Sequence, residues 1–166
     1  AFSHVGASVR NVRFTCPEAT ASLGLVDWAQ SSCVAVPSGS ISRTCGGNSW
    51  SYGAVSRHAI VNDETVAGVR WRMPQETRHV IIGLNNYDSD YSISSIDYGM
   101  YFWTDGYVSI YEHGSERARR RWRYYQQDEA AVQLTDNGAN IQYFLRGSLI
   151  WVSHRTDLRY PLMVDT

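Results

Sequence analysis

The chain has 166 residues, of which 43% are hydrophobic and 19% are charged, and its formal net charge is −1 at pH 7. This length suits one domain with a sizeable buried core. The near-neutral charge excludes a global field that would attract nucleic acid or an anionic membrane. No run of about 18 apolar residues occurs, so the sequence predicts no membrane-spanning helix.

The N-terminal stretch AFSHVGASVRNVRF has the pattern of a β-strand, because Val9, Val12 and Phe14 stand among polar residues. The next stretch, EATASLGLVDWAQSS (residues 18–32), is the nearest approach to a helical pattern. It is short and contains a glycine, so it predicts one or two helical turns at most.

Three cysteines, Cys16, Cys33 and Cys45, follow in the first third of the chain, without the CxxC spacing of zinc ligands. The chain is rich in turns, with 13 glycines. We therefore expect an extracellular or cell-surface protein with a Cys33–Cys45 disulfide. Cys16 would be free or bonded to a neighbour. The alternative is a reduced protein with three buried thiols.

Residues 68–73 alternate apolar Val69, Trp71 and Met73 with arginines, and HVIIGL (residues 79–84) is a continuous apolar run. The first pattern is typical of a strand with one buried face, and the second of a strand buried on both faces.

The stretch SIDYGMYFW (residues 95–103) also has period two, with Tyr98, Met100 and Phe102 on one face. Turn signals follow at Asp105-Gly106, Asn137-Gly138 and Gly147, and each is flanked by strand patterns. Many short antiparallel strands predict an all-β, two-sheet sandwich with little helix, since one open sheet would leave an apolar face in water.

Three stretches together resemble the concanavalin A-like lectin/glucanase superfamily, including its SPRY-like and laminin-G-like relatives. They are GLNNYDSDYSISSIDYGMYFWTDGYVSIYEHG, DEAAVQLTDNGANIQYFLRGSLIWVS and YPLMVDT. The resemblance implies a jelly-roll sandwich and is greatest to tandem modules of large secreted or surface proteins. It covers residues 26–166 and implies little about activity, because this fold carries lectins, hydrolases and inert scaffolds.

Such modules usually end in a closing strand of the form Gly-Ala-x-x-x-Asn-Val-x-Phe, which this chain carries at its beginning, in residues 6–14. The resemblance therefore divides the chain into a closing strand (1–15), a linker (16–25) and a lectin-like sandwich (26–166), together one domain or one repeat unit. In a tandem array, the closing strand would complete the preceding unit, with inter-unit contacts at Val9, Val12, Phe14 and Cys16. A circular permutation and an arbitrary end of the fragment are the alternatives.

The sequence lacks the motifs of two classes of hydrolase, although its five histidines leave a Ser/His/Asp arrangement open. Retaining glucanases need two carboxyl groups about 5 Å apart, but Asp97 has no acidic partner on its predicted strand and is expected to anchor a turn or bond to backbone. No GxSxG motif occurs either. We therefore expect no enzyme and no cofactor, with glycoside hydrolysis as a remote alternative.

The loop NNYDSDYS (residues 85–92) is the candidate binding loop. Aromatic rings can stack on sugars while amide and carboxylate groups bond hydroxyls. Asp88 and Asp90 have the oxygen ligands that calcium prefers, although no EF-hand pattern is present. The candidate glycan-binding residues are Asn86, Tyr87, Asp88, Asp90, Tyr91 and Trp103.

The stretch RARRRWRYY forms a basic patch of five arginines: Arg117, Arg119, Arg120, Arg121 and Arg123. Arginines among aromatics can bind single-stranded nucleic acid or sulfated glycans. Because acidic residues elsewhere balance this charge, we favour an exposed strand whose arginines pair with carboxylates of a neighbouring unit or sheet, and we expect no nucleic-acid partner.

The sequence thus predicts a non-catalytic extracellular structural or adhesion module. Its expected partners are copies of itself or neighbouring repeats, assembled by strand complementation. The alternative is a discrete glycan-binding lectin module.

Overall fold

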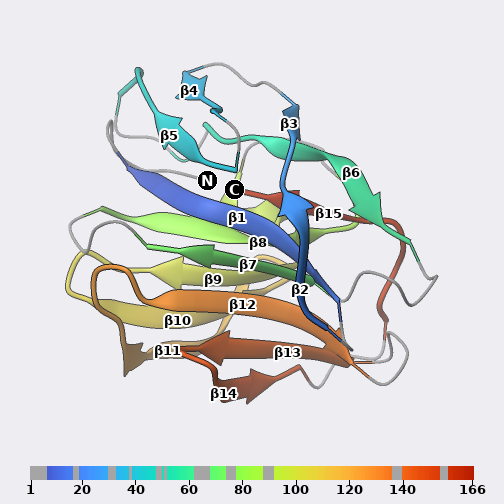
Figure 1. Cartoon of the computed structure of the whole chain (residues 1–166). Coiled ribbons are helices and arrows are strands. Elements are labelled where there is room, and N and C mark those ends of the chain that lie inside the picture. The colour runs from blue at the N-terminus through green and yellow to red at the C-terminus, as the bar shows by residue number, and fades with distance from the viewer. Residues whose placement is uncertain are drawn as a thin grey trace.

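The computed structural model describes residues 7–16, 19–29, 33–37, 39–47, 50, 52–61, 68–73, 78–87, 92–135, 140–153 and 157–166. Two antiparallel sheets pack face to face (Figure 1), which confirms the predicted all-β, two-sheet sandwich. The only helical element of the described residues is one 3-10 turn, η1 (Ile93–Ser95). No helix in this part of the chain is long and apolar enough to cross a membrane.

The first sheet runs in the order β14 (Ser148–Val152), β13 (Asn140–Leu145), β12 (Glu129–Thr135), β7 (Gly68–Arg72), β1 (Ser8–Cys16), β5 (Ile41–Arg43) and β4 (Val34–Ala35), and β2 (Ala19–Leu25) pairs with β1 beside this path. The second sheet runs in the order β11 (Ser115–Arg123), β10 (Tyr107–Glu112), β9 (Tyr98–Phe102), β8 (Val80–Asn85), β15 (Leu162–Asp165), β6 (Val55–Ile60) and β3 (Trp28–Ala29).

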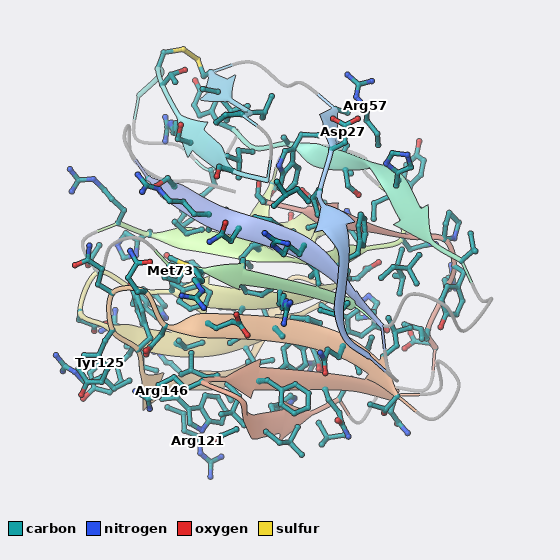
Figure 2. The ribbon with its side chains drawn as sticks, in the orientation of Figure 1. Asp27, Arg57, Met73, Arg121, Tyr125 and Arg146 are labelled. Atoms are coloured by element: carbon teal, nitrogen blue, oxygen red, sulfur yellow. A yellow bond between two sulfur atoms is a disulfide. The ribbon has the colours of Figure 1, made fainter. Side chains whose placement is uncertain are left out.

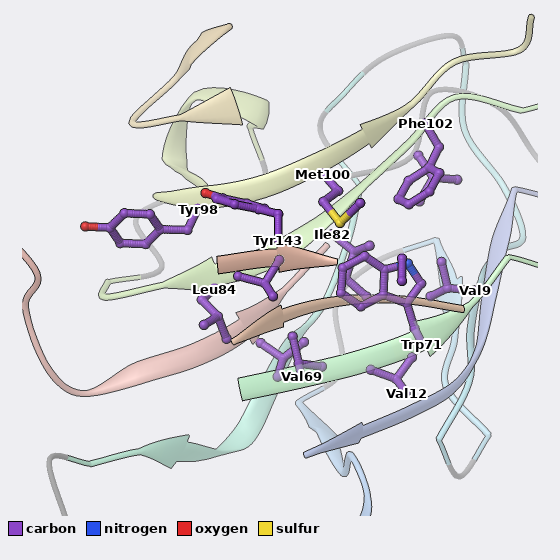
Figure 3. Close-up of a cluster of buried hydrophobic side chains, with 14 of the residues drawn as sticks. Val9, Val12, Val69, Trp71, Ile82, Leu84, Tyr98, Met100, Phe102 and Tyr143 are labelled. Carbon is purple, nitrogen blue, oxygen red and sulfur yellow. The ribbon is translucent and has the colours of Figure 1, made fainter. Parts of the chain in front are cut away.

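The core lies between the two sheets and follows the predicted alternation. Val69, Trp71 and Met73 point into it from β7 and the residue after that strand, and Tyr98, Met100 and Phe102 point into it from β9. Figure 3 shows most of these side chains packed against one another. The centres of the Trp71 and Phe102 rings are 6.1 Å apart in an edge-to-face contact. β8 is buried along its whole length, as its continuous apolar run predicts.

β1 belongs to the sandwich of its own chain. It pairs with β7 on one side, with Phe14 opposite Val69, and with β5 and then β2 on the other side. Val9 and Val12 are fully buried in the core. The closing strand therefore completes this chain's own larger sheet.

The segment predicted as a linker or a short helical stretch differs from that prediction. Ala19–Leu25 forms β2, which pairs with the second half of β1, for instance with Leu25 opposite Arg13. Its sequence, ATASLGL, has small residues and a glycine in place of the β-branched alternation of the other strands. Its strand conformation follows from the backbone of β1, which offers pairing groups beyond the end of β5.

The predicted disulfide is confirmed. Cys33 and Cys45 are bonded, with their Cα atoms 4.7 Å apart. The bond joins the two ends of the β4–β5 hairpin, where Thr44 N donates to the Cys33 carbonyl at 2.9 Å. A disulfide is compatible with an extracellular protein.

The predicted tight turns are also present where the structure describes them. Gly106 and Gly147 have φ angles of +81° and +73°, as their hairpins require. The third predicted turn, Asn137-Gly138, lies outside the described residues.

Candidate functional site

A polar pocket of about 400 Å³ opens at the end of the second sheet, where β8 finishes and β9 begins. These strands are antiparallel, with Leu84 opposite Tyr98, so residues that follow β8 lie beside those that precede β9. The first group supplies Asn86 and Tyr87, and the second supplies Asp97. Tyr87 has an exposed fraction of 73%, which leaves its ring free to contact a ligand.

Asp97 organises the pocket wall through both of its carboxylate oxygens. Oδ2 accepts a hydrogen bond from Asn86 N at 2.9 Å, and Oδ1 lies 2.9 Å from Nδ1 of His113. The Asp97 carbonyl also accepts from His113 N at 2.9 Å. The expectation that Asp97 would bond to backbone is therefore confirmed, and its side chain positions its neighbours.

His113 reaches the pocket from the tip of the β10–β11 hairpin. His113 and Gly114 have φ angles of +48° and +69°, the left-handed pair that a two-residue hairpin turn needs. A Cβ at Gly114 would lie 3.1 Å from the Ser94 carbonyl, so glycine permits the hairpin to approach η1 closely. This approach holds Ser94, an exposed residue, at the pocket rim.

The chain segment before β15 supplies two further lining residues, Asp157 and Arg159. Asn86 Nδ2 donates to the Pro161 carbonyl at 3.1 Å and so joins this segment to the end of β8. The pocket thus combines carboxylates, a guanidinium, an imidazole, amides and hydroxyls around one exposed tyrosine ring.

A buried hydrogen bond fixes the end of β8 beneath the pocket. Asn85 Nδ2 donates to Asp165 Oδ2 of β15 at 3.0 Å, and both residues are almost fully buried. Asn85 Oδ1 in turn accepts from Tyr87 N at 3.3 Å. The backbone that carries Tyr87 is therefore anchored to the sheet.

Trp103, a predicted glycan-binding residue, lies at the opposite end of β9 from Asn86. Its Nε1 donates to Ser109 Oγ at 2.8 Å, and the Arg120 guanidinium lies 4.0 Å from the centre of its ring. The Tyr101 ring packs against it at 4.3 Å. The β8–β9 register thus separates Trp103 from the pocket, and contacts within the protein occupy much of its surface.

Trp103 belongs to an aromatic cluster on the outer face of the second sheet. Tyr101 is at its centre, 5.2 Å from the Trp50 ring and 5.4 Å from the Tyr111 ring. Burial, and secondarily the neighbouring Tyr111, raise the pKa of Tyr101 far above its ordinary value. The cluster is a small second core with a neutral phenol at its centre.

The remaining predicted binding residues, Asp88, Asp90 and Tyr91, lie outside the described residues. Among the residues described, no group of three or more His, Cys, Asp or Glu side chains could hold a metal ion. The calcium hypothesis for Asp88 and Asp90 therefore stays a prediction.

The predicted inter-unit residues occupy β1. Val9 and Val12 are fully buried between the sheets, and Phe14 is partly buried against the same core. Cys16 is the last residue of the strand. The apolar side chains of the closing strand are thus in contact with this chain's own core.

The basic patch lies on β11, and three of its arginines have carboxylate partners nearby in the same sheet. Arg117 pairs with Glu112 at 3.9 Å. Arg119 pairs with Glu116 at 3.7 Å, and Arg120 pairs with Asp105 at 3.0 Å. These partners lie on β10, on β11 and in the β9–β10 turn.

Sequence reasoning did not find His113, Ser94, Asp157 or Arg159 as members of the pocket. The His-Gly dipeptide between two strand patterns was the one available signal, because it marks a tight hairpin turn. The other three positions depend on which loops the sheet brings together.

Comparison of the sequence with protein-family models gave no match, and a search of curated proteins gave none at a significant level.

Proposed function

We propose that this chain is a non-catalytic extracellular adhesion module of the concanavalin A-like type that binds glycans in the Asp97–His113 pocket. The observation that carries the proposal is the exposed Tyr87 ring beside a dense set of hydrogen-bonding groups in a pocket of about 400 Å³. A sugar offers a flat apolar ring face and several hydroxyls, and this combination complements both features.

The contacts of Asp97 support a structural role for this residue within a binding site. One Asp97 oxygen accepts a hydrogen bond from Asn86 N, and the other lies 2.9 Å from Nδ1 of His113. A carboxylate held in this way positions the Asn86 backbone and the His113 ring. We therefore assign Asp97 and His113 to the architecture of the binding site.

The structural building block remains a second proposal, although strand donation would require β1 to leave its own sheet. β1 pairs on both sides within this chain and buries Val9 and Val12. Glycan adhesion needs no such rearrangement, and it is the function that the described geometry supports best.

The test is binding of the fluorescently labelled chain to an array of immobilised glycans, followed by isothermal titration with the retained sugar. Tyr87→Ala should weaken binding about fivefold, since one stacking contact contributes about 1 kcal/mol. Tyr125→Ala is the matched control, because Tyr125 is also exposed, at 48%, and lies outside the pocket. Absence of retained glycans, or equal affinities of wild type and Tyr87→Ala, would refute the proposal.

A further inference from the structure

A second surface feature lies on the flank of the sandwich, away from the polar pocket. β11 and β14 are the outermost strands of their respective sheets at this flank (Figure 1). Between them runs an open groove of about 450 Å³. Arg121 and Trp122 line it from β11, and residues 149–152 line it from β14.

The β14 side of the groove is apolar and belongs to the last strand of its sheet. Leu149 has an exposed fraction of 50%, and Ile150 and Trp151 are partly buried against the core. Among the described strands, β14 pairs only with β13 and stands last in the order of its sheet. Its sequence, SLIWV, also lacks the charges and prolines that usually protect an edge strand.

The β11 side supplies a positive charge. The three neighbouring arginines described above are engaged with carboxylates, whereas Arg121 has no carboxylate partner among the described residues. Its exposed guanidinium lies 5.7 Å from the centre of the Trp122 ring. Figure 2 shows Arg121 at this edge of the molecule, far from Arg57 at the opposite edge.

We propose that this groove binds an extended acidic peptide segment of another protein, which adds along β14 as a further strand. Main-chain hydrogen bonds to β14 would provide affinity. Apolar side chains would pack on Leu149 and Trp122, and a carboxylate would pair with Arg121.

The charges favour a different protein over a second copy of this chain. Pairing of β14 with another β14 brings no carboxylate to Arg121, because SLIWV contains none. Pairing of β11 with another β11 would place two arginine-rich strands together, and like charges directly opposite each other are destabilising.

The experiment is a titration of the ¹⁵N-labelled chain, followed by NMR, with a nine-residue peptide in which valine alternates with glutamate. We expect saturable shifts of the Ser148–Val152 amides and of the Trp122 and Trp151 indole N–H signals. Arg121→Gln should weaken binding roughly tenfold, because it removes a charge-assisted hydrogen bond. Leu149→Glu should weaken it as well through repulsion. A peptide with lysine in place of glutamate should not bind.

Arg57→Gln is the matched control, because it also removes an exposed arginine, one that pairs with Asp27 at the other edge. It should leave the peptide affinity unchanged, and well-dispersed spectra will show that each variant is folded. The proposal is overturned if no shifts occur, if shifts occur away from the groove, or if both groove variants bind like wild type. Equal shifts with dextran sulfate would also overturn it, in favour of a general polyanion site.

Discussion

Tyr143 and Glu112 form a polar pair inside the apolar sandwich. The Tyr143 hydroxyl donates to Glu112 Oε1 at 3.2 Å, and both side chains are almost fully buried. Burial, and secondarily the negative Glu112, raise the pKa of Tyr143 well above its ordinary value of 10.0. The hydroxyl therefore stays protonated and keeps donating to the carboxylate.

This raised pKa predicts a loss of stability in alkaline solution. Above about pH 10, a tyrosine of the unfolded chain releases its proton while folded Tyr143 retains it, so ionisation favours unfolding. Above pH 10, the free energy of unfolding should fall by about 1.4 kcal/mol per pH unit for such a tyrosine. The fall ends when the pH reaches the pKa of the tyrosine in the folded state. Urea unfolding between pH 8 and 11 measures this slope.

Tyr143→Phe tests the same pair at neutral pH. The variant keeps the ring but leaves the buried Glu112 carboxylate without this donor, which should lower the free energy of unfolding by about 1–3 kcal/mol. The alkaline slope should become shallower as well. Tyr125→Phe, which removes an exposed hydroxyl, should change the neutral-pH free energy by less than about 0.5 kcal/mol. An unchanged stability of Tyr143→Phe would contradict the role of this hydrogen bond.

Two hairpins differ in one feature and so provide a matched test of how an element positions the pocket. Gly114 and Gly147 have similar φ angles of +69° and +73°. A Cβ added at Gly114 would lie 3.1 Å from the Ser94 carbonyl oxygen. A Cβ added at Gly147 would have no atom within 4 Å. Gly147→Ala should therefore cost only the left-handed backbone penalty, about 1–2 kcal/mol.

Gly114→Ala should lower the free energy of unfolding by more than Gly147→Ala does, because it adds a steric contact with η1. It should also shift the His113 and Ser94 NMR signals, since the hairpin and η1 must separate. If both variants unfold at the same urea concentration with the same slope, the close approach to Ser94 contributes nothing to stability.

Local pattern was sufficient to predict most strands and their buried faces, because side chains alternate between faces whatever the partner strand is. The burial of Val69, Trp71, Met100 and Phe102 could therefore be predicted without knowledge of the neighbouring strand. β2 was missed because its small residues carry no alternation, and its conformation depends on the free edge of β1.

The candidate site was predicted only in part for a related reason. Asn86 and Tyr87 were found because a polar, aromatic loop is visible in the sequence. Their placement beside His113, and the separation of Trp103 from them, depend on strand register. Register is a property of strand pairs, which local pattern constrains only weakly.

The position of β1 within the larger sheet determines how whole molecules can associate. Each of Val9 and Val12 contributes about 1.5–3 kcal/mol through burial, and strand donation would forfeit this unless a partner replaced it. We therefore expect the 166-residue chain to sediment as a monomer at micromolar concentration. Val12→Asp should unfold this monomer, because it places an unpaired carboxylate in the core.

Val61→Asp is the control for that substitution, because Val61 has an exposed fraction of 50% and a charge there remains in water. Its free energy of unfolding should stay within about 0.5 kcal/mol of wild type. The prediction of a monomer would be contradicted if the wild-type chain sedimented as oligomers that separate only under unfolding conditions. Such behaviour would mean that β1 exchanges between copies, and the repeat-array function would then take precedence over glycan adhesion.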